Sequence, residues 1–369
     1  MPDLPASLVA TVHATLAQAR VPGCSIALVD ADGLRWAGGF GLADLAEQRA
    51  ATADTVYHLF SGTKLFTAVE VLALAERGLL DLDDRLERHL PELPEVADIT
   101  LAQLLSHRSG LRDTLRGLLA ISFPGDEPAT SAEALSLYSL RRARPPGVSV
   151  EYRNVNYALL GEVVSRVAGV EYREALTRDV LEPLGIRAGF GLTPDQRPLA
   201  ATGYIRRWDP MRLVLRVLFP QLPARIYGPR VAGWVALREY ELRTAAIGGL
   251  VGSMPELAKL LSAQLARGSA VLSDAATRRM QTMVAEGAAG IESRVGVGLG
   301  WKLGRAGEHE FLNHEGGGAG FTSELRLYPH AGVGVAVGMN MMRMPQTMRA
   351  AHHLCEAVLA DRDALVERG

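Results

Sequence analysis

The sequence predicts a mixed α/β (α+β) fold: an antiparallel sheet flanked by helices from the two termini, with a mainly helical domain inserted. Two observations predict it. β-rich runs separated by turn residues lie near both ends of the chain, and the middle shows mainly helical spacing of its apolar residues. We therefore expect one discontinuous α/β domain, residues 1–60 and 245–369. Residues 61–244 are expected to form the helical domain.

The N-terminal part is expected to contain a helix and a β-hairpin. Residues 6–20 have helical spacing and stop before Pro22-Gly23. Residues 24–29 are apolar and rich in β-formers, and the turn residues at 30–33 lead into a second run at 34–38. This hairpin would supply the first strands of the sheet.

Helical spacing continues through most of the middle of the chain, and the helix ends carry capping residues. Gly78 and Gly169 suit the position just after a helix, and Thr100 suits a helix start. The expected helices occupy 65–76, 101–107, 156–168 and 172–183. The C-terminal part returns to short β-rich runs, which indicate an antiparallel meander. Its expected strands occupy 296–303, 308–313, 321–328 and 332–339, and a last helix covers 348–361.

Residues 205–243 differ from their surroundings, because eight arginines are interleaved with apolar and aromatic residues. The segment is either a surface excursion whose arginine stems cover apolar side chains or a lid over a substrate cleft. Association with a membrane surface is a weaker alternative, since the amphipathic run is short.

Composition excludes several classes of protein. The 369 residues are 48% hydrophobic and 22% charged with a formal net charge of -2, so nothing favours nucleic-acid binding. Two cysteines, Cys24 and Cys355, do not form a disulfide framework. No apolar run is long enough for a membrane span, and the N-terminus resembles no signal peptide. A cytoplasmic location is therefore expected, and the oligomeric state is left open.

The first chemical motif is Ser61-Gly62-Thr63-Lys64, at the start of the first long helix of the middle region. Residues three apart lie on one helix face, so the Lys64 amine can reach the Ser61 hydroxyl. Such a hydroxyl becomes nucleophilic when a neighbour takes its proton, and a helix N-terminus stabilises negative charge. Taken alone, the pattern is better explained by an N-cap serine and a solvent-facing lysine. Residues elsewhere in the chain that could act with this pair make the catalytic interpretation the stronger one.

Two further stretches could supply such partners. Tyr152 and Asn154 are two residues apart, so they project the same way from an extended segment. A phenol can relay protons if a nearby cation lowers its pKa, and an amide can bind a lysine or a substrate. The stretch 313–320 is rich in glycine, which lets a backbone N–H approach a ligand closely. It could equally be a glycine-rich strand edge with a bulge.

In this order, Ser61-Gly62-Thr63-Lys64, Tyr152-Arg153-Asn154 and His314-Glu315-Gly316 resemble the three motifs of serine β-lactamases and penicillin-binding proteins. The Tyr-x-Asn form is most similar to family VIII carboxylesterases, class C β-lactamases and D,D-peptidases. Supporting similarity lies at 104–111, 156–161 and 248–253. The resemblance implies a β-lactamase-like fold with an active site at the interface of the two domains.

The resemblance also implies roles for individual residues. Ser61 would be the acylated nucleophile, and Lys64 and Tyr152 would manage its proton. Asn154 would orient Lys64 or the substrate. The N–H groups of Ser61 and Gly317 would form the oxyanion hole. No cofactor is implied.

The third motif departs from the usual pattern, because His314 stands where the lactamases carry a lysine and Gly316 completes the motif. A histidine is mostly neutral at pH 7, so it binds a carboxylate less well. Glu315 adds a negative charge beside any anionic substrate. His107 is expected to be a structural turn residue.

These features favour a carboxylesterase acting on neutral, small to medium-chain esters. A weak class C-type β-lactamase, a D-amino peptidase or a D,D-carboxypeptidase is the alternative. A non-catalytic binding protein is less expected, because the nucleophile and relay are intact. A metal site at His352, His353 and Cys355 is disfavoured, because adjacent helical residues point about 100° apart.

Overall fold

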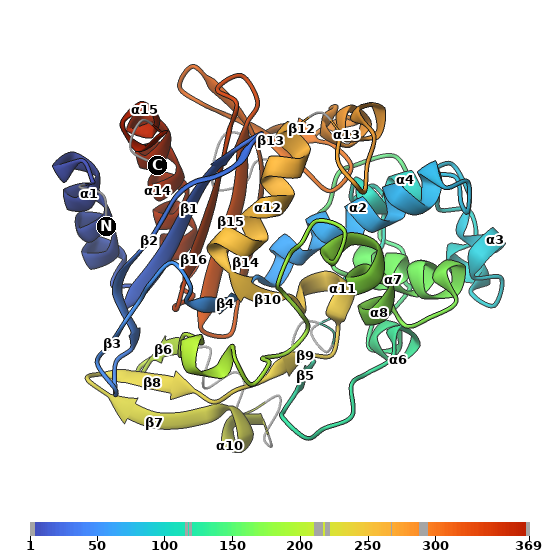
Figure 1. The fold of residues 1–369 in the computed structure, drawn as a ribbon. Coiled ribbons are helices and arrows are strands. Elements are labelled where there is room, and N and C mark those ends of the chain that lie inside the picture. Colours follow the sequence, from blue (N-terminus) through green and yellow to red (C-terminus); the bar gives the residue numbers. More distant parts are fainter. Residues whose placement is uncertain are drawn as a thin grey trace.

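The computed structural model describes residues 4–114, 117, 120–209, 217, 222–266, 268–287 and 294–366. Its described part is built on a nine-stranded sheet in the order β11-β12-β13-β14-β15-β16-β1-β2-β3 (Figure 1). Neighbouring strands in it are antiparallel. The strands are β1 Gly23–Asp30, β2 Gly33–Asp44, β3 Arg49–Ala50, β11 Ala285–Glu286, β12 Arg294–Val297, β13 Lys302–Ala306, β14 His309–Gly318, β15 Phe321–Tyr328 and β16 Val333–Met339. The expected mixed fold with an antiparallel sheet is therefore confirmed.

The two ends of the chain meet inside this sheet. Strand β1 pairs with β2 on one side and with β16 on the other, with Ile26 opposite Val337. The N-terminal hairpin and the C-terminal meander therefore form one continuous hydrogen-bonded surface. The exact domain boundaries expected at 60/61 and 244/245 stay a prediction.

Helices cover both faces of the sheet, and two hydrophobic cores result. The terminal helices α1 (Ala6–Ala19) and α14 (Gln346–Ala360) pack together on one face, and α12 (Met254–Leu265) covers the other (Figure 1). Ile26 belongs to the first core and its neighbour Ala27 to the second, as expected because successive strand residues point to opposite faces. Because β1 is buried on both faces, its sequence is a nearly continuous apolar run rather than an alternating one.

The helical part lies beside the sheet, and α2 (Thr63–Glu76) runs through its centre. Residues 63–74 of α2 are all buried, because helices pack around it on every side. These neighbours and connectors are α3 Leu86–His89, η2 Pro94–Val96, α4 Leu101–Leu105, α6 Ser131–Ser136, α7 Val155–Ala168, α8 Tyr172–Leu176, α11 Ala245–Gly248 and α13 Asp274–Gln281. Thr100 caps α4 through a reciprocal pair with Gln103, and Gly169 ends α7 in the left-handed conformation.

Four expected elements differ from the structure. The strand expected at 296–303 contains a turn, because Gly298 N donates to Trp301 O at 2.9 Å between β12 and β13. The strand expected at 308–313 continues to Gly318, so the glycine-rich stretch is part of β14. The helix expected at 172–183 changes after Leu176 into a π-helical turn, η3 Thr177–Leu181. The last helix is followed by a short one, α15 Arg362–Val366.

The segment 205–243 is not helical over most of its described length. It forms a three-stranded sheet in the order β6-β8-β7 at the foot of the main sheet (Figure 1). Its elements are β6 Tyr204–Arg206, α10 Leu222–Ile226, β7 Tyr227–Val231, β8 Trp234–Leu237 and β9 Glu241–Leu242. Tyr204 N donates to Asn340 O, which ties β6 to the end of β16. Residues 210–216 and 218–221, on which the lid hypothesis depends, lie outside the described residues.

The remaining short elements join these parts. Strand β4 (Val56–His58) pairs with β10 (Val251–Ser253), and β5 (Ile121–Ser122) pairs with β9. The 3-10 turns η1 (Phe60–Gly62) and η4 (Arg197–Leu199) complete the list. Within the described ranges, no helix is both long enough and apolar enough to cross a membrane.

Candidate active site

Ser61 lies on the short turn η1, directly before α2 and against strand β14. Two glycines make this approach possible. A Cβ on Gly316 would lie 2.0 Å from the carbonyl oxygen of Leu59, and one on Gly318 would lie 1.9 Å from the Phe60 ring. Ser323 Oγ on β15 also donates to Leu59 O at 2.6 Å. The glycines of the third motif therefore let the strand pack directly against the turn that carries Ser61.

Lys64 is buried beneath Ser61. Its Nζ lies 3.0 Å from Ser61 Oγ and 3.0 Å from the carbonyl oxygen of Ile247 on α11. Burial lowers the pKa of Lys64 well below its ordinary value, and the nearby charge of Lys302 lowers it further. A lowered pKa increases the neutral fraction of the amine, and only the neutral amine can accept the proton of Ser61.

Tyr152 lies close to two lysines. Its ring centroid is 5.1 Å from Lys64 Nζ and 4.8 Å from Lys302 Nζ. The His107 ring lies 4.5 Å from the Tyr152 ring, and the His314 ring lies 6.0 Å from it. The structure thus brings the second motif beside the first, as the sequence predicts.

Asn154 is held by a residue that the sequence analysis did not single out. Asp113 accepts hydrogen bonds from Asn154 N at 2.9 Å, from Asn154 Nδ2 at 3.2 Å and from Val155 N at 3.0 Å. These are donors at the first turn of α7, which a carboxylate stabilises. Asp113 therefore fixes the position from which Asn154 faces the cavity.

His107 supports the second motif from behind, in agreement with the structural role expected for it. Its Nδ1 accepts from Arg153 N at 3.2 Å and lies 3.2 Å from Asn156 Nδ2. Burial, followed by the charges of Lys64 and Lys302, lowers the pKa of His107 well below its usual value. Its backbone has a φ of 55°, which is rare for a residue other than glycine.

The surroundings of His314 disfavour its charged form. It is fully buried, and its Nδ1 lies 3.0 Å from the Glu315 carbonyl oxygen. Burial, with Lys302 and Lys64 nearby, lowers the pKa of His314 well below its usual value. The neutral state expected from the sequence therefore agrees with its surroundings.

The charge expected from Glu315 is corrected by the structure. Lys302 Nζ on β13 lies 2.5 Å from Glu315 Oε2; the Glu315 side chain is buried, and that of Lys302 is partly buried. The two line the same cavity. Because the ion pair cancels the negative charge of Glu315, the net repulsion of anionic substrates inferred from the sequence is wrong. The third motif itself has no lysine, but Lys302 on the neighbouring strand β13 lines the same cavity.

The cavity beside these residues has a volume of about 480 Å³. Its polar lining includes Ser61, Tyr152, Asn154, Lys302 and Glu315, and the backbone of Gly317 borders it. Most of the rest is apolar or aromatic: Phe60, Ile121, Tyr138, Leu242, Ile247, Met344 and Met348. Ser61 therefore stands at one wall of a mainly apolar pocket.

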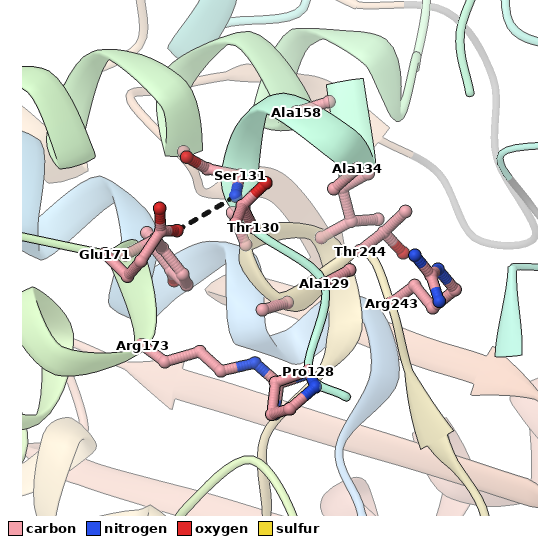
Figure 2. A pocket seen from close by; sticks show the side chains of 15 residues that line it. Pro128, Ala129, Thr130, Ser131, Ala134, Ala158, Glu171, Arg173, Arg243 and Thr244 are labelled. Carbon is pink, nitrogen blue, oxygen red and sulfur yellow. Dashed lines mark hydrogen bonds between the residues drawn. The ribbon is translucent and has the colours of Figure 1, made fainter. Parts of the chain in front are cut away.

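A second, smaller cavity of about 90 Å³ lies behind α11, and Figure 2 shows its lining, with Ser131 N donating to Glu171 at 3.0 Å. It shares Thr244 and Ile247 with the larger cavity, but Ser61 does not line it. The larger cavity is therefore the candidate active site.

Comparisons with known proteins agree with this geometry. Residues 8–358 match the Beta-lactamase family, so the chain belongs to that family. The putative penicillin-binding protein PbpX of Bacillus subtilis (strain 168) is 28% identical over 227 residues, which are 61% of this chain and 54% of that protein. The chain thus matches about half the length of this relative.

Solved structures show the same fold. The octameric penicillin-binding protein homologue from Pyrococcus abyssi has a TM-score of 0.78 and 25% identity, covering 95% of this chain and 76% of that one. The D-amino acid amidase from Ochrobactrum anthropi SV3 has a TM-score of 0.80 and 23% identity, covering 97% and 100%. The chain thus belongs to the Beta-lactamase family and has the fold of the penicillin-binding-protein homologues.

Proposed function

We propose that the protein is a carboxylesterase that hydrolyses neutral esters of small to medium acyl chain length through an acyl-enzyme on Ser61. One observation carries this proposal. The cavity at Ser61 is mainly apolar, and its ionised pair, Lys302 and Glu315, has no net charge. Such a lining favours an uncharged acyl group, because each buried methylene contributes about 0.8 kcal/mol.

The geometry supports a sequence of proton transfers. Neutral Lys64 accepts the Ser61 proton over 3.0 Å as Oγ attacks the ester carbonyl carbon, and the deprotonated phenol of Tyr152 beside Lys64 takes this proton on. The N–H groups of Ser61 and Gly317 would hold the oxyanion. The intermediate then expels the alkoxide, which takes a proton through Tyr152. Water then attacks the acyl-enzyme and gives its proton to the relay of Tyr152 and Lys64. The relay returns a proton to Ser61 Oγ, and the acid is released.

Asn154 is proposed to contact the substrate rather than Lys64. Its side-chain nitrogen donates to Asp113, which leaves its carbonyl oxygen as an acceptor at the cavity wall. Lys64 is meanwhile oriented by Ile247 O. The alternative from the sequence, that Asn154 orients Lys64, is therefore less well supported.

A second candidate is a β-lactamase, a D-amino peptidase or a D,D-carboxypeptidase. The observation that favours it is the same ion pair. Lys302 could bind a substrate carboxylate, and Glu315 could bind an ammonium group. The D-amino acid amidase shares the fold, but at 23% identity it does not indicate the substrate.

One substrate panel separates these candidates. The purified protein is assayed with p-nitrophenyl acetate, butyrate and octanoate, with nitrocefin, and with D- and L-phenylalanine amide. A carboxylesterase gives kcat/KM for an ester at least 100-fold above the values for nitrocefin and both amides. The reverse order would replace the esterase proposal with the second candidate. If a phosphonate labels Ser61 but no substrate of the panel is hydrolysed, Ser61 is the correct nucleophile. Both proposed substrate classes are then wrong.

A further inference from the structure

Lysine is rare in this chain, and its distribution is not random. Of 39 lysine and arginine residues, only Lys64, Lys259 and Lys302 are lysines. Two of these three place Nζ about 5 Å from the same phenol ring, that of Tyr152. The third, Lys259, lies on α12 and bonds Gly185 O and Glu256. Lysines therefore gather where the proposed proton relay lies.

We propose that Lys302 is a positioning residue whose ammonium group favours the deprotonated form of Tyr152 and thereby readies the relay for Ser61. The inference rests on the proposed function in one respect, since it takes Tyr152 as the relay. It adds a residue from outside the three motifs. It also assigns a purpose to the Lys302–Glu315 pair other than substrate binding.

The fold places Lys302 by a short hairpin. Strands β13 and β14 are joined by the two residues Gly307 and Glu308, with Ala306 opposite His309. This turn fixes the register and sets Lys302 opposite Asn313, beside the third motif. Opposed residues lie on the same face, as do residues two apart on one strand, so Lys302 reaches Glu315.

A buried network fixes Lys302 at its charged end. Glu315 Oε2 bonds Lys302 Nζ at 2.5 Å, and Glu315 Oε1 lies 3.4 Å from His352 Nε2 on α14. The same His352 atom lies 3.3 Å from Glu324 Oε2, and Glu324 pairs with the buried Arg326. The carboxylate partner favours the charged form of Lys302. The carboxylate that pairs with Lys302 therefore lies close to the C-terminal helix.

Lys302 is the cation that can act on Tyr152. The other basic groups near the ring include Lys64 on α2, His107 after α4 and His314 on β14, and each of these has a pKa well below its usual value. The Arg153 guanidinium contacts the Tyr152 carbonyl oxygen, but it pairs with Glu151. Tyr157 on α7 has its pKa raised by burial, so it stays neutral. The acidic groups nearby are Glu315, which pairs with Lys302, and Asp113, which caps α7. Lys302 Nζ lies 4.8 Å from the Tyr152 ring centroid, and an opposite charge within about 4–6 Å of an acidic group typically lowers its pKa by about 1–3 units.

The test measures Tyr152 directly, without a substrate. Tyrosine labelled with ¹³C at Cζ gives a titration curve for each phenol, and the Tyr152 signal is the one lost in Tyr152→Phe. The variants are Lys302→Met, Lys302→Arg and, as the matched control, Lys259→Met. Because Lys302→Met leaves Glu315 buried without this partner, the double variant Lys302→Met/Glu315→Gln is measured as well.

We expect the Tyr152 titration to move up by at least one pH unit in Lys302→Met and in the double variant. Lys302→Arg keeps the cation and should remain within about half a unit of the wild type, as should Lys259→Met. The rate of phosphonate labelling of Ser61 should rise at correspondingly higher pH in the two Met variants. An unchanged Tyr152 titration in a folded double variant would overturn the inference. If the phosphonate labels no serine in the wild type, the proposed function fails, while the titration still decides the role of Lys302.

Discussion

Lys64 Nζ lies 3.0 Å from Ser61 Oγ and, on its other side, 3.0 Å from the carbonyl oxygen of Ile247. The carbonyl of Ile247 on α11 accepts a hydrogen bond from the amine and so favours the position of Lys64 beside Ser61. The turn η1 and the start of α2 bring Ser61 and Lys64 together locally, and α11 supplies the third contact from a distant part of the sequence.

The first prediction concerns Ser61. Ser61→Ala should abolish hydrolysis, because it removes the hydroxyl that is paired with Lys64, and the fold should be retained. Mass spectrometry after phosphonate treatment should find one adduct, on the peptide that contains Ser61. Ser253→Ala is the control and should keep activity. An adduct on Ser109 or Ser253 would show that Ser61 is the wrong nucleophile.

The second prediction concerns the pH dependence of stability. Because the pKa of Lys64 is lowered in the folded state, the unfolded chain binds the Lys64 proton in a pH range where the folded chain does not. Stability should therefore rise with pH between the lowered pKa and the unfolded value of about 10.4. One such group contributes a slope of about 1.4 kcal/mol per pH unit.

Lys64→Met removes this contribution. Urea unfolding at several pH values between 7 and 9 should show a smaller slope of unfolding free energy against pH in the variant than in the wild type. Lys259→Met, which removes a half-exposed lysine, should leave the slope unchanged. Equal slopes in all three proteins would mean that Lys64 is charged in the folded state.

The third prediction concerns Tyr152. Tyr152→Phe removes one oxygen and little volume, so its effect should be chemical. General acid–base groups contribute about 100- to 10,000-fold, and we expect kcat to fall within that range. The midpoint of urea unfolding should change little. A kcat within about threefold of the wild type would show that Lys64 works without Tyr152.

The fourth prediction concerns Asp113, which accepts three hydrogen bonds at the start of α7. Asp113→Ala leaves these donors without their acceptor and should lower the free energy of unfolding by about 1–2 kcal/mol. It should also raise KM, because Asn154 loses its support. Asp113→Asn keeps one acceptor oxygen, so its unfolding free energy and its KM should lie between those of the wild type and of Asp113→Ala. An Asp113→Ala protein with unchanged stability and KM would exclude this role.

The parts of the site that could be predicted from the sequence are those that local geometry defines. Ser61 and Lys64 are one helical turn apart, and Tyr152 and Asn154 are two residues apart on an extended segment. The short separation within each pair therefore fixes how its two side chains lie relative to each other. The glycines of β14 could be recognised because their close approach to Leu59 and Phe60 needs a missing side chain.

The parts that were missed depend on contacts between distant segments. Asp113 and Ile247 reach the site only when α7 and α11 pack around α2. Lys302 carried a usable signal, since a two-residue turn at 307–308 fixes its register opposite Asn313. The expectation of one uninterrupted strand at 296–303 obscures that signal. The segment 205–243 was assigned to the helical domain although its mixed arginine and apolar pattern has neither helical nor strand periodicity.

The last prediction concerns the acyl-binding wall. Ile121 on β5 lies opposite Leu242 on β9, and both line the cavity of about 480 Å³. Ile121→Trp places a larger side chain in this space, and Ile121 is only partly buried, so the fold should tolerate it. Leu34→Trp is the control, because Leu34 is exposed on β2 and does not line the cavity.

We expect Ile121→Trp to lower kcat/KM for p-nitrophenyl octanoate at least tenfold more than for p-nitrophenyl acetate. The reason is that the acetyl group needs only the space next to Ser61, whereas an octanoyl chain has six more methylenes to bury, each contributing about 0.8 kcal/mol. Phosphonate labelling of Ser61 should proceed at the wild-type rate, since the relay is untouched. If the two esters lose activity equally, the acyl chain does not bind along Ile121 and Leu242. The lid hypothesis for residues 205–243 would then lose the one described member of that segment, Leu242, that lines the cavity.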